Sequence, residues 1–529
     1  MPEDLLLSDA AARARALDTR CSFIVEAPAG SGKTGLLIQR FLRLLAEGDV
    51  QLPEEVLAIT FTRKATAEMQ QRILKNLQQA AAIADTATLS PFDQTTRALA
   101  QKVLARNAEL GWNLLQQPQR LNIRTIDSLC SEIASHLPIL SGLGGRLQPI
   151  DDARPLYIEA ARRTLEELDS SDATIANALR LILLHRDGRL DECQSLLAEM
   201  LARRDQWARL IPLGRELDAA FLDTTVRPRL ESALREIIAA ALQYAFTLLG
   251  PDDLRELSEL AHLAALELAR TGADHPFVTC MESPLSPQTG AECLEHWCAL
   301  SCLVITKSGD WRKSIDKRIG FPTTSKDKPR LLHLLERMRA NEPLRDALCA
   351  LEKLPPAHYT DREWEVSKAL FHFLHRGMAE LQMVFAERRQ CDFTELSIAS
   401  VAALAGGDAS LAAAMGMRFR HLLVDEMQDT SISQYTLLRR ITQGWDGASQ
   451  TVFLVGDPRQ SIYLFRQARV EQFTRAISEH SLGDVPLEHL QLTANFRSHH
   501  ALVAAFNTHF ERIRPHQINA QDSTLYTAA

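Results

Sequence analysis

The sequence lacks any run of about eighteen consecutive apolar residues, which argues against a membrane-spanning helix. Its first twenty residues carry acidic side chains before any basic one, so they do not form a secretory signal. The nine cysteines are scattered and contain no CxxC pair, which argues against a disulfide framework and indicates reduced thiols. We therefore expect a cytoplasmic protein with no membrane partner.

An excess of positive charge is also lacking, since the formal net charge is −8. This balance argues against a protein coated in nucleic acid, but a local groove can still hold a strand. Hydrophobic residues make up 46% and charged residues 24% of the 529 positions, as is ordinary for a globular protein with room for about three domains.

Short β-branched or apolar runs predict five buried parallel strands at 22–27, 56–61, 122–126, 421–425 and 451–456. Several of these runs end in polar or glycine-containing turns followed by helical patterns, which is typical of an α/β fold. Between about 150 and 390 the apolar residues follow helical spacing and no strand pattern is evident. The sequence therefore predicts a parallel α/β sheet interrupted by a large all-helical insertion.

The stretch "VEAPAGSGKTGLL" (25–37) places a small-residue loop between a strand and an amphipathic helix. Such a loop lets successive backbone N–H groups surround phosphate oxygens at a helix N-terminus. Lys33 would reach the β- and γ-phosphates and the Thr34 hydroxyl would bind Mg²⁺. The nucleotide-binding residues are then expected to be Ala27, Pro28, Ala29, Gly30, Ser31, Gly32, Lys33 and Thr34, with alanine at position 27 where the strict pattern has glycine.

A second strand supplies the acidic residues that a phosphate-binding loop requires. Asp425 ends the apolar run and would hold Mg²⁺, and Glu426 would orient and deprotonate the attacking water. A glutamate beside the metal-binding aspartate favours ATP hydrolysis over GTP hydrolysis, and the base-reading NKxD motif of GTPases is absent. ATP and Mg²⁺ are therefore the expected ligands.

Several motifs together resemble the superfamily 1 DNA helicases of the UvrD/Rep type. They are "AITFTRKATAEMQQRI" (58–73), "DEMQDTS" (425–431), "VGDPRQSIYLFRQA" (455–468) and "LQLTANFRS" (490–498). The helical insertion and "DFTELS" (392–397) resemble the AddA/RecB branch of that family.

The resemblance implies a RecA-like ATP-binding domain and the start of a second RecA-like domain. The expected division is 1–148 and 391–484 for the two parts of the first domain, 149–390 for the insertion, and 485–529 for the incomplete second domain.

The resemblance also assigns roles around the nucleotide. Gln428 would couple the carboxylate strand to the nucleotide and to the neighbouring domain. Gln460 would sense the γ-phosphate and position the water, because an amide both donates and accepts hydrogen bonds. Arg497 would stabilise charge on the transferred phosphoryl group, as an arginine finger does.

For DNA, the resemblance implies backbone-phosphate contacts near two strand ends and an aromatic pair that stacks on bases. Asp127 stands where the family commonly has histidine, and an acidic side chain would repel phosphate, so Thr125 is the expected contact there. The expected DNA-binding residues are Thr62, Arg63, Lys64, Thr125, Tyr463 and Phe465.

The implied function is that of an ATP-dependent DNA helicase or translocase, moving 3′→5′ on single-stranded DNA in recombination or repair. Its expected partners are single-stranded or partly duplex DNA and a second subunit or C-terminal half. Neither the later motifs of a second motor domain nor a nuclease cluster is evident, so we expect weak activity from the 529 residues alone. The alternative from another class is a non-enzymatic DNA-binding or assembly subunit of a helicase–nuclease complex.

Two further segments have charge or cysteine patterns that the motifs above do not explain. Residues 307–330 hold eight Lys/Arg against three Asp, with Trp311 and Phe321 interleaved, and would form either a DNA-contacting arm or a solvated loop. The cluster "CLEHWCALSC" (293–302) lacks zinc-ligand spacing and is expected to consist of core cysteines.

Overall fold

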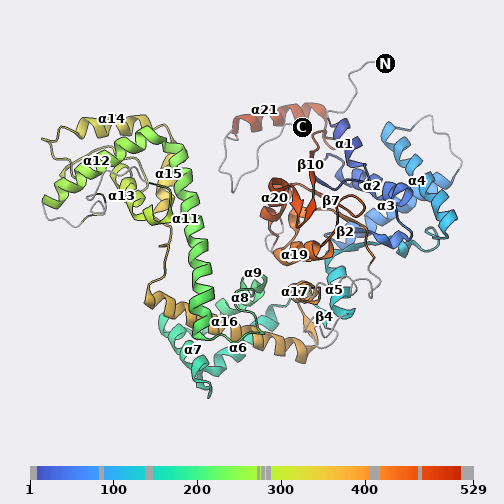
Figure 1. The fold of residues 1–529 in the computed structure, drawn as a ribbon, viewed down its shortest axis with the longest axis horizontal. Helices are drawn as coiled ribbons and strands as arrows, with labels where there is room; N and C mark the ends of the chain where they lie inside the picture. Colours follow the sequence, from blue (N-terminus) through green and yellow to red (C-terminus); the bar gives the residue numbers. More distant parts are fainter. Residues whose placement is uncertain are drawn as a thin grey trace. The chain divides into compact units, whose positions relative to one another are not determined.

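The structure is a computed structural model that describes residues 9–82, 89–136, 147–270, 275, 280, 288–404, 418–462 and 468–513. The chain divides into two compact units (Figure 1). The first unit comprises Met1–Glu166, Leu190–Arg209 and Leu374–Ala529, and the second comprises Glu167–Arg189 and Leu210–Phe373.

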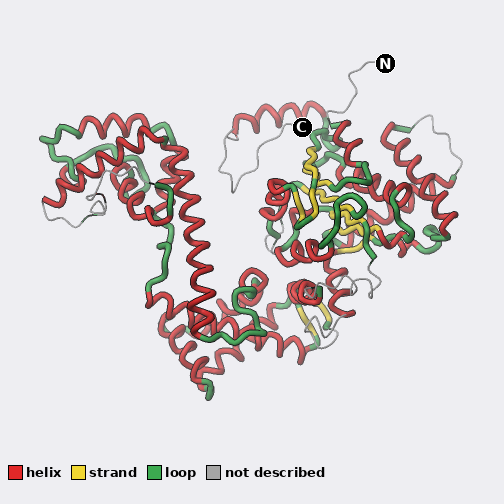
Figure 2. The backbone as a smooth tube through the Cα atoms, viewed as in Figure 1, coloured by secondary structure: helices red, strands yellow, loops and turns green. Residues whose placement is uncertain are grey.

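The first unit is built on a six-stranded sheet in the order β10-β1-β7-β6-β2-β3, in which every neighbouring pair is parallel. Its strands, drawn yellow in Figure 2, are β1 (Phe23–Glu26), β2 (Val56–Thr60), β3 (Ile123–Thr125), β6 (His421–Val424), β7 (Thr451–Gly456) and β10 (Glu488–Gln491). Strands β2, β6 and β7 are buried along their whole length, as expected for a parallel sheet covered on both faces.

All five strands expected from the sequence are present, and the α/β fold with a helical insertion is confirmed. The sixth strand, β10, lies at the sheet edge and pairs Phe23↔Glu488 through Glu26↔Gln491. Residues 488–491 therefore extend the first sheet, although the expected division placed them in a second domain. The sheet of the first unit ends at Gln491 rather than before residue 485.

Helices surround the sheet. Helices α2 and α3 pack on one face, where alternate strand residues such as Phe23, Val25 and Phe453 lie, and α4 packs against α2 and α3. The helices of this unit are α1 (Ala10–Ala16), α2 (Lys33–Glu47), α3 (Arg63–Ala81), α4 (Pro91–Leu110), α5 (Ile126–His136), α6 (Arg154–Glu166), α8 (Leu190–Ala202), α9 (Arg204–Trp207), α17 (Phe393–Ala403), α19 (Ile432–Ile441), α20 (Val470–Glu479) and α21 (His500–Ile513).

A buried ion cluster fixes the start of α17. Arg204 is 2% exposed and donates to Asp392 at 2.6 and 2.7 Å and to Glu395 at 2.8 Å. Asp392 also accepts from Tyr157 and caps α17 by accepting from the Glu395 N–H at 2.7 Å. Since α17 packs against both α5 and α19, the cluster supports the helices that follow β3 and β6. Removing one partner would leave the opposite charge buried without compensation.

The second unit is helical in its described part, apart from one isolated bridge between Ile305 and Trp311. Its apolar core includes Trp297, Phe321 and Leu334, with Trp311 packed against it. The aromatic residues of the 307–330 segment thus belong to the core or its edge, while Lys313 and Lys317 are exposed. The helices are α7 (Ala173–His185), α10 (Ala219–Phe221), α11 (Arg227–Leu249), α12 (Pro251–Arg270), α13 (Leu294–Val304), α14 (Lys328–Met338) and α15 (Glu342–Leu351).

The units divide the insertion differently from the expected single block 149–390. Residues 149–166, 190–209 and 374–390 of the expected insertion belong to the first unit. Helix α16 (Asp361–Arg388) contributes to both units. Two short pairs complete the strands: the parallel β4 (Gln148–Pro149) with β5 (Gln390–Cys391), and the antiparallel β8 (Ser481–Leu482) with β9 (Val485–Pro486).

One helical stretch in the described residues, Ala219–Leu249, is long and apolar enough to cross a membrane by length and composition alone. Core helices of soluble proteins pass the same test, so this stretch is weak evidence for a membrane span.

Candidate nucleotide and DNA site

Two glycines shape the loop of residues 27–34 that follows β1, which we call the P-loop. Gly30 and Gly32 adopt left-handed backbone conformations with φ of +83° and +75°, and Gly32 directly precedes α2. Ala27 is buried, continues the sheet by donating to Gly456 at 2.9 Å, and is followed by Pro28 and the exposed Ala29.

Within this loop the Ser31 hydroxyl oxygen is buried and has no hydrogen-bond partner among the described residues. An unpaired buried hydroxyl is costly, so this group fits a loop completed by a ligand. Thr34 lies in the first turn of α2, beside Lys33.

Lys33 is paired with Glu426, and Gln428 donates to the same carboxylate at 2.8 Å. Asp425 follows β6 directly and is 7% exposed. Burial, together with repulsion from Glu426, raises the pKa of Asp425 to about 6, although Lys33 partly opposes the shift. A buried carboxylate with this cost of ionisation is suited to hold a cation.

A line of hydrogen bonds continues from this pair to β7. The Gln428 side-chain oxygen accepts from the Asp457 N–H at 3.0 Å, and Gln460 donates to the Asp457 carboxylate at 2.6 Å. The P-loop lysine is thereby connected through Glu426 and Gln428 to Gln460. Three strand ends, those of β1, β6 and β7, contribute to one connected group of polar side chains, as expected at the carboxyl edge of a parallel sheet.

Arg497 lies in a turn that sits directly on the P-loop. The Phe496 N–H donates to the Gly30 carbonyl at 2.8 Å. A Cβ atom added to Gly30 would lie 2.7 Å from the Asn495 side-chain oxygen and 2.8 Å from the Arg497 Cβ. The Arg497 guanidinium makes no hydrogen bond or ion pair within the described chain and is exposed. Phe496 is 58% exposed.

The residues expected to bind DNA lie at the ends of β2 and β3. Thr62 caps α3 by accepting from the Ala65 N–H at 3.1 Å, and Thr125 caps α5 by accepting from the Ser128 N–H at 3.1 Å. Arg63 and Lys64 are exposed in the first turn of α3. The expected stacking pair, Tyr463 and Phe465, lies outside the described residues.

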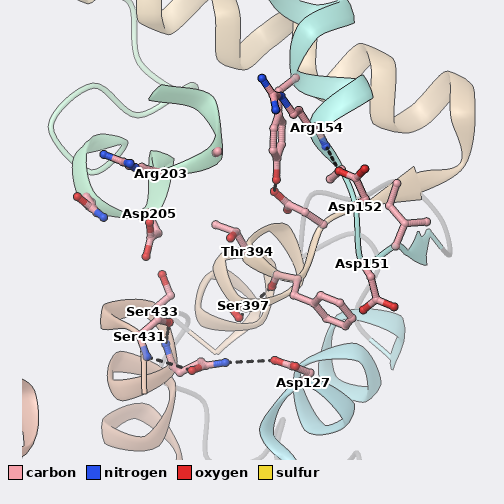
Figure 3. A pocket seen from close by; sticks show the side chains of 18 of the residues that line it. Asp127, Asp151, Asp152, Arg154, Arg203, Asp205, Thr394, Ser397, Ser431 and Ser433 are labelled. Atoms are coloured by element: carbon pink, nitrogen blue, oxygen red, sulfur yellow. Dashed lines mark hydrogen bonds between the residues drawn. The ribbon is translucent and has the colours of Figure 1, made fainter. Parts of the chain in front are cut away.

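A cavity of about 890 Å³ adjoins this end of the sheet, and its lining includes Phe61. Figure 3 shows Asp127, Ser431 and Asp205 among the residues that line it. Asp205, at its wall, is 4% exposed, and burial raises the pKa of this carboxyl to about 6. The lining is mixed in charge and includes the basic residues Arg154, Arg203 and Arg469 and the acidic residues Asp127, Asp151, Asp152, Glu199, Asp205 and Asp392. The excess of acidic residues disfavours binding of DNA phosphates in this cavity. The exposed side chains of Arg63 and Lys64 suit contacts with the DNA backbone better.

The structure adds residues to which the sequence assigned no role at this site. Asp127 accepts from Gln434 at 3.1 Å, and Gln434 also closes the capping box of α19 with Ser431. Asp457 belongs to the "GDPRQS" motif and directly follows β7, so the sequence already indicated that it could lie at this site. The contact of Asp127 with Gln434 spans 307 residues and leaves no local signal in the sequence.

The model of the family described as "UvrD/REP helicase N-terminal domain" matches residues 8–240 and 299–481. Among curated proteins, one named as a subunit of the "ATP-dependent helicase/nuclease" of Acetivibrio thermocellus is 26% identical over 93% of this chain and 38% of its own length. The protein of the same name from Moorella thermoacetica is 26% identical over 95% of this chain and 34% of its own length.

The chain thus spans well under half the length of these relatives. The family match, in contrast, covers most of the chain and includes the P-loop, the Asp425–Glu426 pair and Gln460. The chain therefore belongs to the UvrD/REP helicase N-terminal domain family.

Proposed function

We propose that this chain is the ATP-hydrolysing motor part of a DNA helicase or translocase acting in recombination or repair. The observation that carries the proposal is the connected polar group running from Lys33 through Glu426 and Gln428 to Gln460. It joins the loop that would hold phosphates to the strand ends that would activate water. Movement 3′→5′ on single-stranded DNA is the polarity we propose.

The P-loop residues 27–34 would surround the triphosphate, and the buried Ser31 hydroxyl and left-handed glycines support this role. Thr34 and Asp425 would hold Mg²⁺, and the buried Asp425 carboxylate fits a cation. When bound, the metal ion neutralises charge on the phosphate oxygens. Lys33 must exchange its contact with Glu426 for the phosphates when nucleotide binds.

That exchange frees Glu426 for the reaction. Released from Lys33, its carboxylate would accept the proton of the attacking water, and Gln460 would orient the water. The water oxygen bonds to the γ-phosphorus while the bond to the ADP oxygen breaks, giving ADP and inorganic phosphate. Arg497, whose guanidinium faces no protein partner in the described chain, would stabilise the charge on the transferred group.

Phe496 is a further proposed contact. Its ring stays 58% exposed beside the P-loop, with the Arg13 guanidinium 5.1 Å from the ring centroid. A flat exposed ring of this kind suits stacking on a nucleobase. This contact would bind the base of the nucleotide without hydrogen-bond readout.

On the DNA side, Arg63 and Lys64 would bind backbone phosphates at the start of α3, where the helix N-terminus adds favourable charge. Thr62 and Thr125 would contribute from the adjoining turns, and Tyr463 and Phe465 would stack on bases. Expected partners are single-stranded or partly duplex DNA and another subunit, since the relatives are named as subunits of a helicase/nuclease. The cytoplasm is the proposed location.

The test is ATP hydrolysis by the purified chain with and without single-stranded DNA, in the wild type, Lys33→Ala and Lys102→Ala. Lys102 is a surface lysine with 60% of its side chain exposed, paired with Glu47, and serves as the matched control. We expect DNA-stimulated hydrolysis that Lys33→Ala abolishes and Lys102→Ala retains. Binding of DNA without nucleotide binding would favour the non-enzymatic subunit, and binding of neither would contradict both functions.

A further inference from the structure

The residue preceding the short helix α1 connects this helix with residues 493 and 494, next to the P-loop. Asp9 is 4% exposed and accepts from the N–H groups of Thr493 and Ala494 at 3.0 and 3.1 Å. It also accepts from Arg13 at 2.7 and 2.9 Å. Four donors thus converge on one buried carboxylate, next to the turn that carries Arg497.

Arg13 connects this carboxylate to the phosphate loop itself. Its guanidinium donates to the Ser31 carbonyl at 2.6 Å and lies over the Phe496 ring. A charge-assisted bond of this kind is stronger than a neutral one and holds a defined geometry. Asp9 and Arg13 together, which we call the Asp9–Arg13 bracket, therefore contact both the P-loop and residues 493–496.

The turn held by the bracket has little freedom to shift. The Asn495 side-chain oxygen accepts from the Arg497 and Ser498 N–H groups at 2.9 and 3.0 Å, which closes the turn. The backbone of Phe496 is bonded to Gly30, and the space above Gly30 is filled by Asn495 and Arg497. Fixing the start of this turn therefore fixes the point from which the Arg497 side chain leaves the backbone.

We propose that the Asp9–Arg13 bracket is a positioning device that holds Arg497 over the P-loop, at the place where a γ-phosphate would lie. The inference rests on the proposed function, since it assigns the bracket to the same nucleotide site. Asp9 and Arg13 contact no nucleotide in this role. They act through Arg497, so their loss should weaken the binding of nucleotides that carry the third phosphate more than the binding of ADP.

The charge on Asp9 is central to the bracket. Burial tends to raise the pKa of Asp9, but hydrogen bonds from Arg13, Ala494 and Thr493 outweigh this effect and leave it below its usual value. The carboxylate is therefore ionised throughout the neutral range. Its loss would leave two backbone N–H groups and Arg13 without their acceptor.

The experiment measures dissociation constants for ADP and for a non-hydrolysable ATP analogue in the full chain. The variants are Asp9→Ala, Arg497→Ala, the double variant and Arg15→Ala. Arg15 is the control, because it lies on the same helix and pairs with Glu488 of β10 without contacting the P-loop in the described interactions. The dissociation constant for ADP divided by that for the ATP analogue reports the contribution of the γ-phosphate to binding.

We expect Arg497→Ala and Asp9→Ala each to reduce this ratio about tenfold, the size of one charge-assisted hydrogen bond. The double variant should be no worse than Arg497→Ala, because both changes remove the same interaction. Arg15→Ala should keep the wild-type ratio. An unchanged ratio in Asp9→Ala, equal weakening of both nucleotides, or additive losses in the double variant would each overturn the inference.

Failure of the proposed function has a different signature. It would appear as nucleotide binding that Lys33→Ala leaves intact, or as no nucleotide binding in the wild type, and either result would also overturn the bracket. If Asp9→Ala does not fold, Asp9→Asn replaces it, since the amide keeps one acceptor oxygen but loses the charge. That variant should show a smaller loss in the same ratio, and an unchanged ratio would refute the inference.

Discussion

His421, at the start of β6, makes the stability of the sheet depend on pH. The side chain is 2% exposed, its Nδ1 pairs with the Thr451 hydroxyl at 2.8 Å, and its Nε2 has no partner among the described residues. Burial, with Arg40 and Arg420 nearby, lowers the pKa of His421 from 6.5 to about 3. The folded protein thus keeps this imidazole neutral where the unfolded chain would protonate it.

The sign follows from proton binding. Below pH 6.5 the unfolded chain takes up a proton at His421 that the folded chain refuses until about pH 3, so the stability contributed by this residue falls as pH falls. With these two values, acidification from pH 7.5 to 5.0 costs about 2 kcal/mol of unfolding free energy through His421. Replacing the residue by leucine removes this contribution.

Other groups change stability in the opposite direction over the same range. Asp205, Asp425 and Asp429 have pKa values raised to about 6 by burial, so their protonation on acidification stabilises the folded state. The wild-type pH dependence is therefore a sum of opposing contributions. The diagnostic quantity is the difference between the wild type and His421→Leu.

The assay is hydrogen exchange of the peptide spanning residues 418–426, at pH 7.5 and 5.0, corrected for intrinsic exchange rates. We expect the wild type to lose about 2 kcal/mol more protection of β6 than His421→Leu does. Equal changes in the two proteins would refute the reasoning, because they would mean that His421 titrates alike in the folded and unfolded chains.

Two further changes test the loop and the ion cluster. Gly30→Ala should weaken nucleotide binding at least about tenfold, because the added Cβ would lie 2.7 Å from the Asn495 side-chain oxygen in the neighbouring turn. The control Gly111→Ala, with φ of +64° and nothing within 4 Å of the added Cβ, should lower stability alone. Titration with a fluorescent nucleotide measures binding, and a melting curve measures stability. Arg204→Ala should destabilise the sheet unit by about 3–5 kcal/mol because two buried carboxylates lose their partner. The control is Arg203→Ala, at the exposed neighbouring residue. An equal decrease in the urea midpoint of unfolding in the two variants would contradict the expectation.

Sequence patterns predicted those parts of the fold that have strong local signals. Long apolar runs such as 451–456 mark buried parallel strands because both faces of each strand are covered. Strand β10 escaped prediction because its sequence, "EHLQ", is only partly buried at a sheet edge and has no continuous apolar run. Its pairing with β1 joins residues more than 460 positions apart.

The same contrast holds for the site. Asp425 and Glu426 follow β6 directly, and Lys33 begins the helix that follows the loop after β1. The rule that ligands bind at strand ends therefore brings them together without a structure. Asp9 precedes a seven-residue helix, and its partners Thr493 and Ala494 lie 484 and 485 residues away. No local pattern distinguishes such a carboxylate from an ordinary surface aspartate, because its burial depends on packing between segments more than 480 residues apart.

The order of strands in the sheet has a consequence for how the polypeptide is made. Strand β1 leaves the ribosome early, but its two neighbours are β7 at Thr451–Gly456 and β10 at Glu488–Gln491. At a synthesis rate of about 5–20 residues per second, β1 waits roughly 20 seconds or more for both partners. During that interval the helical second unit, whose residues are all synthesised before β7 and β10, can fold. The apolar residues of β1, Phe23, Ile24 and Val25, therefore stay without their sheet partners during synthesis, and a chaperone that binds apolar segments would protect them.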